Sequence, residues 1–184
     1  AAANAKLPLV AILRGIKPEE AEEIGFSLYD CGFRLIEVPL NSPDPFTSIA
    51  TIRRVLPDDA LVGAGTVLTT EQVSQLKGCG GELAVMPHAD TELIRAAKAL
   101  GLLCIPGIAT PTEAFAALAA GADALKLFPA ELVTPQILKA IRVVLPAGTR
   151  LLPVGGITPE TMKPYLDAGA GGFGDAFSDI FGDI

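Results

Sequence analysis

The sequence predicts an α/β protein built as a compact (β/α)8 barrel of the TIM type. Eight short apolar segments recur along the 184 residues, and most are near-continuous runs, as in parallel strands that are buried on both faces. Amphipathic segments of helical length lie between them. A doubly wound open sheet is the alternative arrangement of the same units. No linker interrupts the pattern, so we expect a single domain over residues 1–184.

The expected strands follow the apolar runs in order. They are residues 7–15, 34–40, 61–67, 83–87, 102–107, 124–129, 150–156 and 171–175. Helical patterns are clearest in residues 18–32 and 90–101. The chain ends soon after the last of these strands, so we expect the eighth helix to be truncated or absent, or that side of the barrel to be covered by a neighbouring subunit.

Local signals predict where several helices begin and end. A hydroxyl residue followed by proline predicts a helix start at Ser42–Pro43, Thr110–Pro111, Thr134–Pro135 and Thr158–Pro159. Capping-box spacing supports the starts at Thr69 and Thr110. Glycines suited to a left-handed C-cap follow helical runs at Gly32, Gly101, Gly121 and Gly169.

Composition narrows the classes of function. The net charge is −7 and no Lys/Arg run occurs, which disfavours nucleic-acid binding but allows an anionic small substrate at a local site. No apolar run has the length of a membrane span and no signal peptide is visible, so we expect a cytoplasmic protein. The three cysteines fit no zinc pattern and are expected to be reduced. The single histidine, His88, is expected on the surface, and we expect neither a metal nor a cofactor.

Lys126 stands inside the apolar run 124–128, where a lysine is rarely buried without a partner. A snorkelling side chain or an edge strand would explain it without any chemistry. A desolvated amine with a lowered pKa would instead be a nucleophile.

Glu37 poses the same question in the run 34–40. Two ionisable groups inside barrel strands are costly apart and reasonable together, either as a structural ion pair or as a catalytic pair. An amine that attacks a carbonyl forms an iminium, and a nearby carboxylate moves protons at the α carbon and on the departing hydroxyl. The pair therefore favours a class I aldolase, whose chemistry needs no metal.

Further candidates lie at the C-terminal ends of the strands, where barrels of this type carry their active sites. They are Arg14, Asn41, Thr66 and Pro87, together with the Val154–Gly155–Gly156 turn. Backbone amides in that turn, before the helix that begins at Thr158–Pro159, are suited to bind an anion. A plain tight turn is the alternative.

With these residues in place, the chain resembles the KDPG/KHG aldolase family over nearly its whole length. The resemblance rests on the segments IEVPLNSP, VGAGTVLT, IPGIATPTEAF, ALKLFPAE and VGGITPE. Asn41 where gluconate enzymes carry arginine, and Val154 where they carry threonine, make the chain most similar to the branch that acts on 2-dehydro-3-deoxy-6-phosphogalactonate.

The resemblance implies roles for individual residues. Lys126 would form a Schiff base with pyruvate and Glu37 would be the acid/base. Arg14 and Thr66 would hold the carboxylate, while Gly155 and Gly156 would contact the phosphate, with Ser178 as a further candidate there. It also implies a homotrimer.

Several other functions remain open from the sequence. One is aldolase activity on 2-keto-3-deoxy-6-phosphogluconate or 4-hydroxy-2-oxoglutarate. Another is a phosphate-binding barrel, an isomerase or decarboxylase, that uses Lys126 only as an electrostatic group. The last is a non-catalytic oligomeric scaffold.

Overall fold

Parallel strands alternate with helices in the computed structural model, which describes residues 9–176. The strands are β1 (Leu9–Ile12), β2 (Leu35–Pro39), β3 (Leu61–Gly65), β4 (Leu83–Val85), β5 (Leu103–Ile105), β6 (Gly107–Ile108), β7 (Leu125–Leu127), β8 (Leu151–Pro153) and β9 (Phe173–Ala176). The helices are α1 (Ala21–Asp30), α2 (Pro45–Val55), α3 (Thr70–Gly78), α4 (Thr91–Ala99), α5 (Pro111–Ala119), α6 (Pro135–Val144) and α7 (Pro159–Ala168). None of the helices between residues 9 and 176 combines the length and apolarity needed to cross a bilayer.

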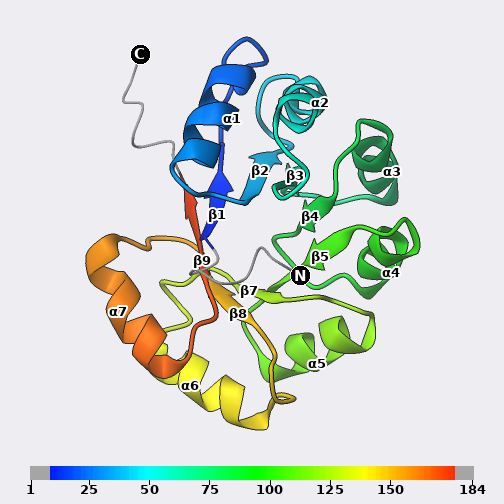
Figure 1. The fold of residues 1–184 in the computed structure, drawn as a ribbon. Coiled ribbons are helices and arrows are strands. Elements are labelled where there is room, and N and C mark those ends of the chain that lie inside the picture. Colours follow the sequence, from blue (N-terminus) through cyan, green and yellow to red (C-terminus); the bar gives the residue numbers. More distant parts are fainter. Residues whose placement is uncertain (1–8, 177–184) are drawn as a thin grey trace.

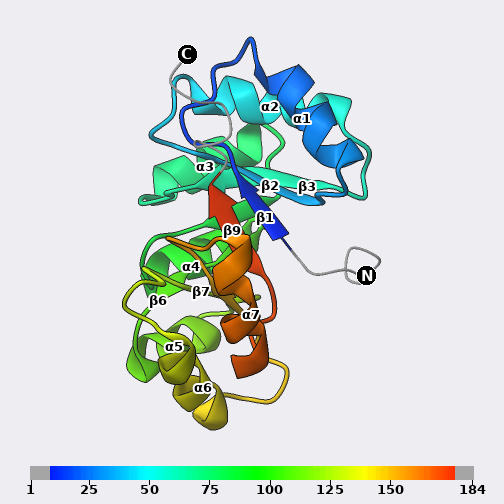
Figure 2. The same ribbon diagram turned by 90° about the vertical axis from the view of Figure 1, so that its left-hand side faces the viewer.

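The strands form two curled parallel sheets. The larger has the order β5-β4-β3-β2-β1-β9 and the smaller the order β6-β7-β8. The seven described helices follow one another in chain order around the outside of the strands (Figure 1). From the side, the strands lie between α1 and α2 at one end and α5, α6 and α7 at the other (Figure 2). The predicted α/β class with a parallel sheet is therefore confirmed.

A strand overlaps each of the eight predicted runs, but the fifth run contributes to two strands. It gives β5 and β6, which belong to different sheets and are separated by Pro106. Proline has no N–H to donate to a ladder, so it interrupts the pairing on one side of the strand. The carbonyl of Pro106 still accepts a hydrogen bond from the Lys126 N–H at 2.9 Å.

Most helix starts are where the sequence predicts them. Thr69 and Thr110 form complete capping boxes with Gln72 and Glu113, and the Thr134 hydroxyl accepts a hydrogen bond from the Ile137 N–H. The four predicted C-terminal glycines all have positive φ, between 72° and 105°. The start at Thr158–Pro159 is also confirmed, since α7 begins at Pro159.

The predicted helix start at Ser42–Pro43 is wrong. Helix α2 begins at Pro45, and its N-cap is Asp44 in the left-handed conformation. The Ser42 hydroxyl instead accepts a hydrogen bond from the Gly15 N–H at 3.0 Å, which ties the loop after β2 to the loop after β1. The hydroxyl is thus used by a residue 27 positions away, which a local pattern cannot reveal.

Apolar side chains fill two layers. The larger cluster lies between strands and helices and includes Ile36, Val62 and Ile52, all fully buried. The smaller cluster lies on the inner side of the curled sheets. It consists of Val10, Leu83, Val85, Ile105, Ala124 and Leu152. This inner layer forms a packed floor beneath the C-terminal ends of the strands.

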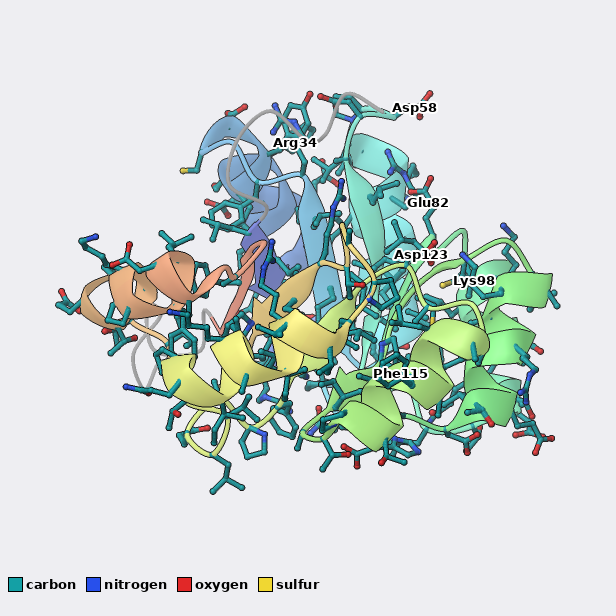
Figure 3. All side chains as sticks on the ribbon, turned by 90° about the horizontal axis from the view of Figure 1, so that it is seen from below. Arg34, Asp58, Glu82, Lys98, Phe115 and Asp123 are labelled. Atoms are coloured by element: carbon teal, nitrogen blue, oxygen red, sulfur yellow. The ribbon has the colours of Figure 1, made fainter. Side chains whose placement is uncertain are left out.

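Polar contacts join the elements around this core. Lys98 of α4 and Asp123, labelled in Figure 3, form an ion pair at 2.7 Å, and the same carboxylate oxygen accepts a hydrogen bond from the Cys104 N–H. Phe115, also labelled there, projects from α5 with 48% of its surface exposed.

Candidate active site

A cavity of about 410 Å3 opens at the C-terminal ends of the strands. This volume is within the range of roughly 300–1,000 Å3 that is common for small-molecule sites. Its lining residues come from both sheets and from the loop before α7. They are Ile12, Arg14, Glu37, Thr66, Pro87, Lys126, Phe128, Val154, Gly155, Gly156, Ile157, Thr158 and Gly174. Both strand residues singled out from the sequence, Glu37 and Lys126, therefore face one cavity.

Lys126 is the central residue of β7 and only 8% of its surface is exposed. Its neighbours Leu125 and Leu127 are fully buried in the outer apolar layer, so alternation along the strand turns Lys126 inward. Burial lowers the pKa of the amine; Glu37 opposes this effect and Arg14 adds to it. The Nζ atom lies 4.5 Å from the centroid of the Phe128 ring. The environment thus favours the neutral, nucleophilic amine.

Glu37 is the middle residue of β2 and is 2% exposed. Burial raises its pKa from 4.5 to about 7, while the positive charges of Lys126 and Arg14 act in the opposite direction. Its Oε2 atom is buried without a hydrogen-bond partner among residues 9–176, and no ion pair within 4.0 Å joins it to Lys126 there. A carboxyl group with a pKa near neutrality is suited both to accept and to return a proton.

Arg14 lies at the rim of the cavity, and Asn41 fixes its orientation. The guanidinium NH1 donates a hydrogen bond to the Asn41 Oδ1 atom at 2.9 Å. Both residues are exposed, and Arg14 lines the cavity. Asn41 therefore contacts Arg14 from the neighbouring loop, a contact that strengthens the link between these loops made by Gly15 and Ser42.

Thr66 and Pro87 line the same side of the cavity, after β3 and β4. Thr66 has φ of 55°, a left-handed conformation that is unusual for a β-branched residue and costs about 1–2 kcal/mol. Such strain is concentrated at functional sites. His88, directly after Pro87, is exposed, as the sequence predicts.

The Gly155–Gly156 turn forms the opposite wall, with φ of 104° and 60°. Within the described part of the chain, neither glycine N–H donates to an acceptor. The turn precedes α7, whose dipole adds positive potential at this end. Unpaired amides at the start of a helix are suited to bind an anion. Val154 contributes an apolar surface beside them, and Ser178 lies outside the described residues.

Two residues near the site are not predicted as site residues from the sequence. Phe128 lies against the amine of Lys126. Glu131 places its carboxylate against the glycine turn, with Oε2 2.9 Å from the position that a β carbon on Gly155 would take. Both belong to the segment ALKLFPAE, but only their position in space reveals the contact.

Comparisons with known proteins agree with this arrangement. The family model for KDPG and KHG aldolase matches residues 2–175. The chain is 50% identical over 167 residues to a probable 2-dehydro-3-deoxy-6-phosphogalactonate aldolase of Rhizobium meliloti (strain 1021), covering 91% of this chain and 79% of the relative. It is 49% identical over 169 residues to the 2-dehydro-3-deoxy-6-phosphogalactonate aldolase of Escherichia coli (strain K12), covering 92% and 82%.

A solved structure described as native KDPGal superposes with a TM-score of 0.90 at 48% identity, covering 94% of this chain and 84% of that chain. The family model, the relatives and the solved structure thus all indicate the same family. The chain belongs to the KDPG and KHG aldolase family of carbon–carbon lyases.

Proposed function

We propose that the protein is a class I aldolase that cleaves 2-dehydro-3-deoxy-6-phosphogalactonate into pyruvate and glyceraldehyde 3-phosphate. The observation that carries the proposal is the pairing of a buried lysine and a buried glutamate, Lys126 and Glu37, in one cavity. The relatives at about half identity bear this substrate in their names, which supports the choice of substrate.

The reaction uses the two groups in sequence. The neutral amine of Lys126 attacks the C2 carbonyl of the keto acid, and loss of water with uptake of one proton from solvent gives an iminium. The Glu37 carboxylate takes the proton of the C4 hydroxyl, the C3–C4 bond breaks, and its electron pair moves into the iminium to form an enamine as the aldehyde leaves. Glu37 returns the proton to C3, and water then attacks the iminium to release pyruvate, restore the neutral amine and return one proton to solvent.

The two anionic ends of the substrate bind on opposite sides of the cavity. Arg14 takes the carboxylate together with the hydroxyl of Thr66, because a guanidinium matches a planar carboxylate. Asn41 acts through Arg14, whose guanidinium it holds at 2.9 Å. The free amides of Gly155 and Gly156 take the phosphate. Ser178 remains a candidate for the same phosphate.

Pro87 and Val154 bound the space for the carbon chain. The side chain of Val154 offers no hydrogen bond to a substrate hydroxyl, and the residue that contacts Arg14 from the next loop, Asn41, is neutral. Both residues support the galactonate epimer over the gluconate epimer.

We also propose that the two sheets together form one closed (β/α)8 barrel. The Asp123 N–H donates to the Cys104 carbonyl, and the Lys126 N–H to that of Pro106, at 3.0 and 2.9 Å. Val154 forms a parallel bridge with Gly174 on the other side of the smaller sheet. These contacts connect the sheets at both edges, which supports closure.

We further propose that the protein is a homotrimer and that it is cytoplasmic. Apolar side chains are exposed on adjacent outer helices, Phe115 on α5 and Val143 on α6, at 48% and 80%. Burial in an interface of more than roughly 1,000 Å2 would remove them from water. All three cysteines are free thiols, which supports a reducing compartment.

The decisive experiment is borohydride reduction in the presence of pyruvate, read by mass spectrometry. The wild type should gain the mass of a reduced pyruvate adduct on Lys126, and Lys126→Met should gain none. An unmodified Lys126 would instead favour one of two alternatives, a phosphate-binding barrel without Schiff-base chemistry or a non-catalytic scaffold. Retro-aldol turnover of both epimeric phosphates and of 4-hydroxy-2-oxoglutarate then decides the substrate, and faster cleavage of the gluconate epimer would overturn that part of the proposal.

A further inference from the structure

We propose that Gly65 is a positioning residue for the reaction, because the Glu37 carboxylate occupies the space that a side chain at position 65 would fill. The inference rests on the proposed role of Glu37 as acid/base. It assigns to Gly65 a function that depends on its having no β carbon.

The geometry at Gly65 is specific to the glutamate. A β carbon built on Gly65 would overlap the Oε2 and Cδ atoms of Glu37 and lie 2.5 Å from Oε1. All three of its nearest atoms belong to that one side chain. The first obstacle to a side chain at this position is therefore the glutamate and not the backbone of a neighbouring strand.

Gly63 on the same strand provides the contrast. A β carbon there would overlap the carbonyl oxygen of Leu83 and lie 2.7 Å from its Cα, both backbone atoms of the next strand. Gly63 therefore permits the close approach of β3 to β4. The two glycines face the same side of one strand, yet the nearest atoms are backbone at Gly63 and a single carboxylate at Gly65.

Strand register explains why the carboxylate reaches Gly65. Glu37 pairs with Gly63, and Pro39 pairs with Gly65, in the parallel ladder of β2 and β3. Glu37 and Gly65 thus face the same side of the sheet, but Gly65 lies two residues closer to the C-terminal ends of the strands. The carboxylate must lean toward the C-terminal ends, over Gly65 and toward the mouth of the cavity, to occupy this position.

Packing matters here because hydrogen bonds do not fix the whole group. Oε2 of Glu37 has no hydrogen-bond partner among residues 9–176. The absence of a side chain at position 65 therefore decides where this oxygen lies. A methyl group would displace the carboxylate, and a displacement of about 1 Å can reduce turnover about 100-fold. Formation of the Schiff base at Lys126 on the other sheet should remain, since the atoms nearest to a Gly65 β carbon all belong to Glu37.

The test is a double-mutant cycle of Gly65→Ala with Glu37→Ala. Gly65→Ala alone should lower kcat about 100-fold and leave the pyruvate–borohydride adduct on Lys126 intact. In the Glu37→Ala background the same change should cost no further activity, because the obstructing carboxylate is absent. A purely structural role would reduce kcat by the same factor in both backgrounds.

Thermal stability gives a second cycle that is independent of activity. Gly65→Ala should lower Tm in the wild type and not in Glu37→Ala, even where the single variant folds poorly. Gly78→Ala, at a position with open space around it, is the matched control and should change neither kcat nor the adduct. Full activity of Gly65→Ala, or equal Tm losses in both backgrounds, would overturn the proposal. If the wild type forms no adduct, the proposed aldolase fails, while the stability cycle still decides the contact.

Discussion

Replacing Glu37 by glutamine should remove a loss of stability that the wild type suffers as the pH rises. The folded-state pKa of Glu37 is about 7, above its ordinary value of 4.5. Between these values the folded protein binds more protons than the unfolded chain, so the free energy of unfolding falls with increasing pH. At about 1.4 kcal/mol per pH unit, the loss amounts to about 3 kcal/mol and is complete above the folded-state pKa.

Glutamine keeps the shape of protonated glutamate and carries no charge at any pH. The stability of Glu37→Gln relative to the wild type should therefore rise by about 3 kcal/mol from pH 4.5 to pH 8. Urea unfolding at fixed protein concentration measures it, with circular dichroism as the signal because the chain has no tryptophan. The fixed concentration matters because association would add its own contribution to stability.

Glu160→Gln is the control with the opposite sign. The Thr158 side chain lowers the pKa of the exposed Glu160, so its ionised form stabilises the protein above the ordinary pKa, and its removal should cost stability there. Parallel pH profiles for the wild type and Glu37→Gln would refute the reasoning, because Glu37 would then titrate alike in the folded and unfolded states.

Three further outcomes are expected. Arg14→Ala should weaken pyruvate binding by about 10- to 100-fold, the range for loss of a charged hydrogen bond; unchanged dependence of borohydride trapping on pyruvate concentration would contradict its role. Glu131→Gln should lower KM for the phosphorylated substrate several-fold and leave pyruvate affinity unchanged, because a carboxylate near the glycine turn repels a phosphate by about 1 kcal/mol; an increase in KM would show that Glu131 assists binding. Ser48→Ala should leave stability unchanged or raise it by about 1 kcal/mol, because the buried hydroxyl has no hydrogen-bond partner within residues 9–176, and a clear loss in urea unfolding would reveal one.

The central pair of the site could be predicted because its signal is local. A charged residue within an apolar strand is costly, so Glu37 and Lys126 each stand out without knowledge of the fold. In the predicted parallel barrel, the C-terminal ends of their two strands lie on the same side. The helix starts at Thr110 and Thr134 were predictable for the same reason, since a cap and the amide it satisfies lie within three residues.

The missed features depend on residues that are distant in the sequence. Ser42 has the pattern of an N-cap, but its hydroxyl bonds to Gly15 across the loops. Gly65 has no feature in the sequence that distinguishes it from other strand glycines. Only the structure shows that the Glu37 carboxylate occupies the position its β carbon would take. Glu131 approaches the glycine turn from a different loop. Each contact joins two strands or loops, so a pattern within one segment carries no trace of it.

The division of the chemistry between two sheets means that the chain can be considered as two halves. A cut between α5 and β7 would leave Glu37 and Arg14 in the first piece and Lys126 with the glycine turn in the second. The pairings of β6 with β7 and of β1 with β9 both cross this cut, so each piece contains two strands whose natural partners belong to the other. Neither piece alone would hold a complete set of reacting groups. Turnover would then report reunion of the fragments, which makes this fold a natural split enzyme for sensing whether two fused proteins meet.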